Sequence, residues 1–182
     1  MTVGTIGSFA VIILANNNST QDQAQATKDA AAQQTAAAQQ QLASAQANAN
    51  NSEAFDGYTA QTFDPASVTS LKVDTLVKGT GDTVKSTDSI NSSYFGWTSD
   101  GKIFDSSKKK DAKADAPITF SLAQVIKGWT QALTGLKVGS VVRLSIPSEL
   151  GYGASGSGTI PANAPLQFIV KINKIDNSAA AH

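Results

Sequence analysis

The stretch that decides the fold is VIKGWTQALTGLKVG, residues 125–139. It places a tryptophan, Trp129, directly after a glycine, where a short amphipathic helix begins, and its apolar spacing predicts that helix over residues 129–136. The chain has only two tryptophans. Leucine would fill a core at this position more simply, so the indole requires a reason. As a single residue, Trp129 fits a packed core and the floor of an apolar pocket about equally well.

Segments of alternating apolar residues surround this helix and predict an antiparallel sheet. A hairpin is expected over residues 89–105, with Asp100 and Gly101 at its turn. Further strands are expected within residues 70–82, 116–120, 140–146 and 166–175. The last of these places one set of large apolar residues on a single face, namely Leu166, Phe168, Val170 and Ile172. An antiparallel sheet with one short helix is an α+β fold.

The first sixteen residues differ in character from the rest of the chain. They contain an uncharged apolar run at positions 3–15. That run is shorter than the ~20 residues of a transmembrane helix but falls within the ~7–15 residues of an export-signal core. No lysine or arginine precedes it, as expected if it belongs to a longer signal or anchor. We expect an export signal or membrane anchor, with a stray hydrophobic end as the alternative.

Residues 17–63 form a low-complexity spacer rich in alanine and glutamine. These residue types favour helix, but Leu42 is the one large apolar residue between positions 21 and 50. A helix without an apolar stripe has little to bury and is marginal on its own. The spacer is therefore expected to be helical or disordered. The folded domain is expected at residues 64–177, with a disordered tail at residues 178–182.

Composition excludes several classes of function. Basic and acidic residues number 14 each, which leaves no cationic surplus for a nucleic acid partner. The chain has no cysteine, and its one histidine is the terminal His182. A thiolate nucleophile, a Ser-His-Asp triad and a histidine-ligated metal are therefore unavailable. The sequence GYGASG at residues 151–156 matches a dinucleotide fingerprint, but SGTIPANAP after it cannot begin the helix that such a site requires.

The order of the motifs in the domain resembles one protein family. YFGWTSDGKIFDSS (residues 94–107) is followed by VIKGWTQALTGLKVG and then by SVVRLSIPSELGYGASGSGTIPANAPLQFIVKI (residues 140–172). Over residues 68–175 the chain is similar to the FKBP-type peptidyl-prolyl cis-trans isomerases. The resemblance implies a half-wrapped antiparallel sheet around one short helix, with an apolar pocket between them. In that family the tryptophan after V-I-x-G forms the pocket floor, which is the role implied for Trp129.

The resemblance also assigns the other pocket positions. The implied catalytic residues hold or orient the prolyl amide, and they are Tyr94, Asp105, Trp129, Tyr152 and Phe168. The implied substrate-binding residues form the walls, and they are Phe104, Ile118, Phe120, Val125, Ile126 and Ile160. The Tyr152 hydroxyl and the Ile126 N–H resemble the groups that bond substrate carbonyls. Asp105 resembles a rim carboxylate that accepts a hydrogen bond, with Tyr94 as the expected donor.

Each of these residues also has an ordinary structural explanation. Phe104, Phe168 and Val125 alternate with polar residues as core residues do, and Asp105 alone fits a turn. Some features depart from the family pattern as well. Ile118 stands where an aromatic residue is frequent, and the loop GASGSGTIP (residues 153–161) has small residues where some members carry a bulky one. These departures leave macrolide affinity and substrate preference open.

The function implied by the resemblance is rotation of X–Pro peptide bonds without cofactor, metal or covalent chemistry. The expected partners are proline-containing polypeptides, with macrolide inhibitors as further candidate ligands. A monomer is expected, located outside the cytoplasm as a secreted protein or one tethered to the membrane through residues 1–16. The alternative is a binding module of the same fold that recognises proline without turnover.

Overall fold

The computed structural model describes residues 19–55 and 57–177. The expected export segment at residues 1–16 and the tail at residues 178–182 lie outside these described residues. The chain divides into two compact units, Met1–Gln40 and Gln41–His182. None of the described helices combines the length and the apolarity that a bilayer-spanning helix needs.

The spacer contains a long α-helix, α1 (Ser19–Asn50), so of the two states expected for this segment the structure has the helical one. Its side chains are described from residue 35 onward, and nearly all of them are exposed, Leu42 included. Ala45 and Ala49 are half-buried. These two residues are one turn apart and share a helix face, so among the side chains described from residue 35 onward the covered face of α1 lies near its C-terminal end.

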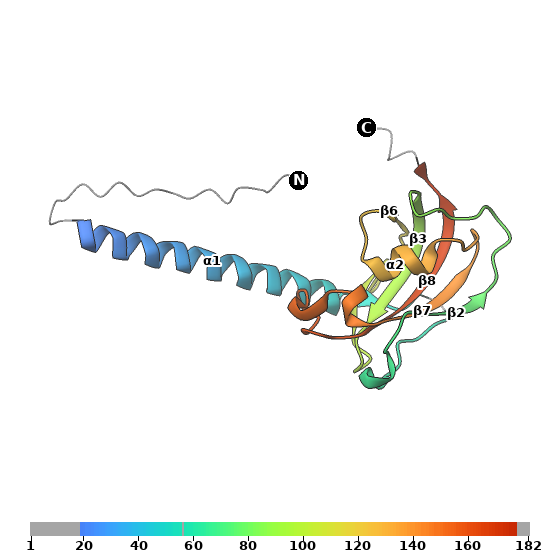
Figure 1. The fold of residues 1–182 in the computed structure, drawn as a ribbon, viewed down its shortest axis with the longest axis horizontal. Helices are drawn as coiled ribbons and strands as arrows, with labels where there is room; N and C mark the ends of the chain where they lie inside the picture. The colour runs from blue at the N-terminus through green and yellow to red at the C-terminus, as the bar shows by residue number, and fades with distance from the viewer. Residues whose placement is uncertain (1–18, 56, 178–182) are drawn as a thin grey trace, which may run out of the picture. The chain divides into compact units, whose positions relative to one another are not determined.

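The domain is built on a six-stranded antiparallel sheet (Figure 1). The strand order is β2-β7-β8-β3-β4, and β6 pairs with the first residues of β3. The strands are β2 (Lys72–Val77), β3 (Ser89–Trp97), β4 (Ile103–Ser106), β6 (Ile118–Ser121), β7 (Val141–Ile146) and β8 (Leu166–Ile175). Four of them lie within segments predicted from apolar alternation, and β4 and β6 each run one residue beyond theirs. The α+β fold is therefore confirmed.

A single short helix, α2 (Lys127–Leu133), packs against this sheet. It begins two residues before the predicted range of 129–136 and ends three residues before the end of that range. It ends early because Gly135 (φ +87°) turns the chain soon after Leu133. Gly128 allows the helix to lie close to β7, since a Cβ at this position would be 2.5 Å from Cγ2 of Ile146. The helix buries Gly128, Trp129, Ala132 and Leu133.

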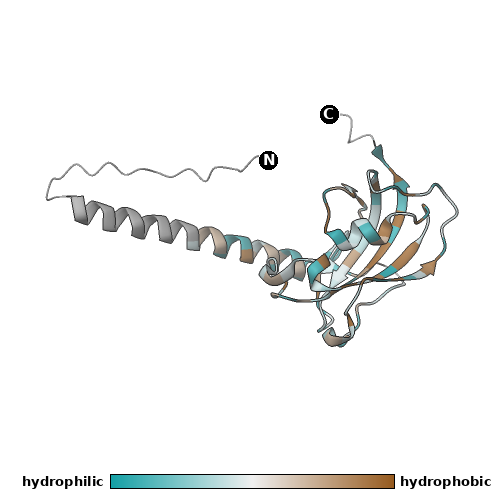
Figure 2. Ribbon diagram, viewed as in Figure 1, coloured by the Kyte–Doolittle hydropathy of each residue, from teal (hydrophilic) through white to brown (hydrophobic). Residues whose placement is uncertain are grey.

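The sheet has apolar residues packed on both of its faces, and Figure 2 shows hydrophobic residues along its strands. The predicted apolar face of β8 is buried in the main core with α2. Ile169, on the opposite face of the same strand, belongs to a second core with Phe95, Trp97 and Val141. A strand buried on both faces is expected to carry consecutive apolar residues, as β8 does around Ile169.

The second core is completed by a segment that the sequence assigns to the spacer. Phe55 is 7% exposed and packs edge-to-face on Phe95, with ring centroids 5.5 Å apart. Just before it, β1 (Ser52–Glu53) pairs antiparallel with β5 (Lys108–Lys109). The structured domain thus extends N-terminal to the predicted boundary at residue 64. Phe55 is a single buried aromatic residue after a low-complexity run. The sequence around it therefore has no apolar periodicity from which the start of the domain could be predicted.

The remaining described elements are three short 3-10 turns. They are η1 (Pro65–Ser67), η2 (Ser148–Leu150) and η3 (Gly153–Ser155). The last of them directly follows Tyr152 and opens the loop at residues 153–161. This loop therefore begins beside one of the predicted site residues.

Candidate functional site

A cavity of about 420 Å³ gathers side chains from β3, β4, β6, β8, α2 and two loops. Its lining consists of Tyr94, Phe104, Asp105, Ile118, Phe120, Gln124, Val125, Ile126, Trp129, Tyr152 and Phe168. Every site residue predicted from the sequence contributes to it except Ile160. Gln124 was not predicted, because a polar residue in a loop carries no pattern of its own.

Trp129 lines this cavity and is also part of the main core. Its ring is 5% exposed. Three aromatic rings meet it edge-to-face, with centroid distances of 5.3 Å to Tyr94, 4.9 Å to Phe120 and 5.2 Å to Phe168. Edge-to-face contacts of this kind are a favoured aromatic geometry. The indole is therefore held as a rigid flat surface, which a leucine could not provide.

Ile160 lies beside the cavity rather than in its wall. It is 7% exposed and belongs to the main core. It also lines a separate niche of about 150 Å³ that adjoins Asp105 and Tyr152. Ile160 is therefore a core residue next to Asp105 and Tyr152, and it does not line the aromatic cavity.

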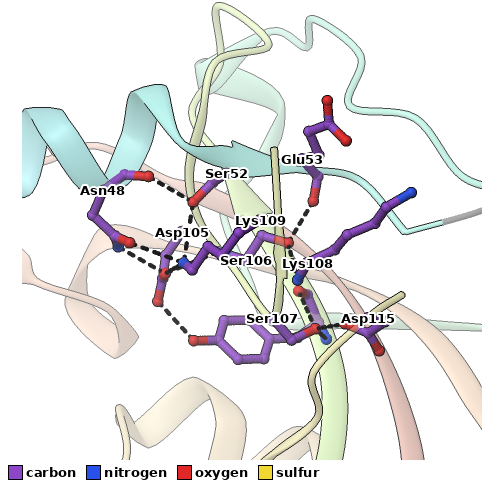
Figure 3. A network of polar contacts seen from close by, with 10 residues as sticks. Asn48, Ser52, Glu53, Asp105, Ser106, Ser107, Lys108, Lys109 and Asp115 are labelled. Atoms are coloured by element: carbon purple, nitrogen blue, oxygen red, sulfur yellow. Dashed lines mark hydrogen bonds and ion pairs between the residues drawn. The ribbon is translucent and has the colours of Figure 1, made fainter. Parts of the chain in front are cut away.

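Asp105 accepts hydrogen bonds at both of its carboxylate oxygens (Figure 3). The Tyr94 hydroxyl donates to Oδ2 at 2.7 Å, which is the donor expected from the sequence. Oδ1 accepts from the Ser106 N–H at 2.9 Å and from the Asn48 amide at 2.9 Å, and Lys109 forms an ion pair with it at 3.4 Å. A carboxylate occupied in this way is a fixed acceptor rather than a free base.

The backbone of Tyr94 is held by a buried hydroxyl. Ser107 is 2% exposed, and its Oγ accepts the Tyr94 N–H at 2.9 Å. The same hydroxyl donates to Oδ1 of Asp115 at 2.6 Å. Both ends of Tyr94, backbone and phenol, therefore have defined partners, so the ring is fixed against the cavity.

Two further donors stand where a substrate carbonyl could meet them. Ile126 is the N-cap of α2, and the N–H of an N-cap residue has no acceptor within its own helix. Tyr152 is 38% exposed and presents its side chain to the cavity. These are the groups that the resemblance implied as carbonyl donors.

The two tyrosines remain protonated well beyond neutral pH. Burial, followed by the hydrogen bond to Asp105 and its charge, raises the pKa of Tyr94. Burial is also the main cause that raises the pKa of Tyr152, with the charge of Asp105 second. Both phenols thus stay hydrogen-bond donors across the physiological range.

We expect the folding stability to fall above pH 10, and to fall less in a Tyr94→Phe variant. Because the pKa of Tyr94 is raised in the folded state, folding favours the protonated phenol. That contribution is complete below the unfolded pKa of about 10 and is lost as pH rises toward the folded pKa. Urea unfolding at pH 8, 10 and 11 measures the loss. Equal losses in the parent and the variant would contradict the burial of this hydroxyl.

A larger cavity of about 800 Å³ also has Phe104 in its lining. Among the described residues that line it, Phe104 is the only aromatic one, and the others are largely polar or small. An apolar cavity with a few convergent polar groups is the usual form of a small-ligand site. The smaller, aromatic cavity meets that description and is the candidate site.

Comparisons with known proteins agree with this geometry. Residues 81–173 match the family of FKBP-type peptidyl-prolyl cis-trans isomerases. The FKBP-type peptidyl-prolyl cis-trans isomerase FkpA of Aeromonas hydrophila is 44% identical over 102 residues, which are 56% of this chain and 37% of that protein. The FK506-binding protein of Neisseria meningitidis serogroup A is 41% identical over 107 residues, 58% of this chain and 96% of that protein.

A solved structure supports the same assignment. The crystal structure of a peptidyl-prolyl cis-trans isomerase from Pseudomonas syringae pv. tomato has a TM-score of 0.51 and 30% identity, covering 77% of this chain and 91% of that one. The chain spans only 37% of the Aeromonas protein and 38% of a Haemophilus influenzae relative. It covers nearly all of the Neisseria protein, and the family match extends over most of the sheet and α2. The chain therefore belongs to the FKBP-type peptidyl-prolyl cis-trans isomerase family.

Proposed function

We propose that this chain accelerates cis–trans rotation of X–Pro bonds in polypeptides by holding the proline ring on Trp129. The observation that carries the proposal is the aromatic cavity of about 420 Å³, with Trp129 as its floor and hydrogen-bonding groups at its rim. The floor has the flat shape of a proline-binding surface. The rim donors match the carbonyls on either side of a prolyl bond.

The geometry supports catalysis by stabilising the twisted amide. Rotation about a peptide bond faces a barrier of about 18–20 kcal/mol because resonance must be broken. The planar amide is more polar than the twisted one, so an apolar site disfavours the planar ground states more. Aromatic rings such as Phe104 and Phe168 make the site apolar. The Tyr152 hydroxyl and the Ile126 N–H would orient the carbonyls while the bond turns.

Asp105 has an electrostatic and structural part in this mechanism. Its two oxygens accept from Tyr94 and from the donors opposite, which fixes the Tyr94 ring against Trp129. No proton moves in a rotation, so a general base is not required. The proposal therefore includes no covalent step.

Exported proteins are the proposed clients. The apolar run at residues 3–15 supports a location outside the cytoplasm, with the protein secreted or tethered to the membrane. The proposed form is a monomer. Proline-containing polypeptides are the proposed partners, and macrolides are candidate inhibitors at the same cavity. Ile118 lines the cavity and is 44% exposed, and we propose that this side chain affects ligand preference.

A second candidate function uses the same cavity without turnover. An FKBP-like pocket could bind proline segments as a recognition module, because binding needs only the floor and the rim donors. The near-complete set of family pocket residues, of which only Ile160 lies outside the cavity lining, favours the enzyme. The two functions differ in one observable, the rate of X–Pro exchange at saturating protein.

The test is a prolyl isomerisation assay on the parent, a Tyr152→Phe variant and a Tyr58→Phe control. Tyr58 packs on Phe55 in the second core, so its change removes the same hydroxyl far from the cavity. Loss of a hydrogen bond worth about 1 kcal/mol lowers kcat/KM about fivefold in Tyr152→Phe, and Tyr58→Phe stays at the parent value. A folded parent that binds a proline peptide without accelerating exchange would establish the binding module instead.

A further inference from the structure

We propose that Asn48, near the end of α1, is a positioning residue for Asp105, which makes the last turns of α1 part of the isomerase site. The inference rests on the proposed function, because Asp105 and Tyr94 are assigned to that site. It deepens that function by adding a residue from the alanine- and glutamine-rich helix. This helix lies outside the 81–173 range that matches the family.

Both polar atoms of the Asn48 side-chain amide form hydrogen bonds (Figure 3). Its Nδ2 donates to Oδ1 of Asp105 at 2.9 Å, and its Oδ1 accepts from Nζ of Lys109 at 2.9 Å. A carboxylate needs a donor and an ammonium group needs an acceptor, so these partners fix the orientation of the amide. Asn48 therefore joins the two members of the Lys109–Asp105 ion pair.

The backbone that carries Asn48 is anchored to the domain within a few residues. The Ser52 hydroxyl donates to the Asn48 carbonyl at 2.8 Å. Ser52 then pairs with Lys109 in the β1–β5 ladder, and the Lys110 N–H donates to the Asn51 carbonyl at 2.8 Å. Because this backbone is already ordered, the Asn48 side chain loses little further freedom when it binds Asp105.

A separate contact places the same helix end against the loop that follows Tyr152. A Cβ built on Gly158 would lie 2.6 Å from the Cβ of Ala45, so only glycine permits this approach. Ala45, Asn48, Asp105 and Tyr152 line the same niche of about 150 Å³. The end of α1 thus touches the rim on both the Asp105 side and the Tyr152 side.

The hydrogen bond from Asn48 can act on the reaction only through Asp105. It is the shorter of the two side-chain contacts to Oδ1, since Lys109 is at 3.4 Å. When it is lost, the carboxylate can turn and weaken the bond between Oδ2 and the Tyr94 hydroxyl. The pair is partly exposed to solvent, so the expected effect on kcat/KM is modest, about threefold.

The first test is a double-mutant cycle in the full chain with the prolyl isomerisation assay. Asn48→Ala is expected to lower kcat/KM about threefold, and Asn50→Ala, the same change two positions along the helix, leaves it at the parent value. In an Asp105→Ala background, Asn48→Ala is expected to have no further effect, because the two residues act as one unit. Additive losses in the cycle would overturn the proposal.

The second test uses the pH dependence of Asn48→Asp. The titratable groups around the new carboxyl are Asp105 and Lys109, which Asn48 contacts, and Tyr152, which lines the same niche. Tyr94 is reached only through Asp105. At pH 7.5 the added carboxylate cannot donate to Asp105, so activity falls below that of Asn48→Ala. As pH falls toward the ordinary aspartate pKa of about 4, a growing fraction of the new carboxyl is protonated and can donate again, so activity relative to the parent recovers. A constant ratio between pH 7.5 and 4 would count against a role through Asp105.

A readout independent of activity separates this proposal from the proposed function. The Tyr94 hydroxyl proton, followed by NMR, is expected to exchange with water faster in Asn48→Ala than in the parent or in Asn50→Ala. Faster exchange in a chain without isomerase activity would remove the proposed function and keep the positioning role. An active parent whose Tyr94 proton exchanges at the same rate in Asn48→Ala would remove the positioning role alone.

Discussion

Phe55→Ala is expected to lower the free energy of unfolding by about 3–5 kcal/mol, the range for deleting a buried aromatic ring. Phe55 is 7% exposed and covers the second core, where its ring meets Phe95 at 5.5 Å and Tyr58 at 5.0 Å. The cost therefore combines lost burial with an open cavity beside Phe95.

Urea unfolding monitored by tryptophan fluorescence measures this loss, with Leu42→Ala as the control. Leu42 is 45% exposed on α1, and exposed substitutions of this kind change stability by about 0.5 kcal/mol or less. A loss below about 1 kcal/mol in Phe55→Ala would mean that residues 52–63 contribute little to the folded domain. The domain would then begin near residue 64, as the sequence suggested.

Regular patterns made most of the sheet and α2 predictable from the sequence. The alternation in β8 identified the face that holds Leu166, Phe168, Val170 and Ile172, and all four are buried in the main core. The Asp-Gly pair at positions 100 and 101 also predicted a turn, and Gly101 adopts φ +79° there, a conformation that glycine favours. The cavity residues came from the motif order rather than from periodicity, since Phe104 or Val125 alone fits ordinary packing.

The contacts made by the N-terminal segment could not be predicted in the same way. Phe55, Asn48 and Lys109 each depend on the register of the β1–β5 pairing, and both of these strands are two residues long. A ladder this short has no period to detect. Side-chain hydrogen bonds between residues 57 positions apart, such as Asn48 to Asp105, depend on the folded geometry and not on local sequence.

Gly96→Ala is expected to lower kcat/KM about a hundredfold while the domain stays folded. Gly96 lies on β3 opposite Phe168 on β8 and Asp105 on β4. A Cβ there would be 2.4 Å from Cε1 of Phe168 and 2.7 Å from Cζ of Phe104. Both rings line the cavity, and Phe168 also packs on Trp129. One added methyl group must therefore displace the walls of the site.

The size of the effect follows from how the displaced rings are used. Overpacking by one methyl costs about 1–3 kcal/mol, which a domain of ordinary stability, about 5–15 kcal/mol, can tolerate. A shift of about 1 Å in the groups that position a substrate can cost about a hundredfold in rate. The isomerisation assay and a thermal melt of the same sample separate the two effects. Full activity per folded molecule would show that Phe104 and Phe168 do not position the proline, because the clash leaves no arrangement in which both rings keep their places.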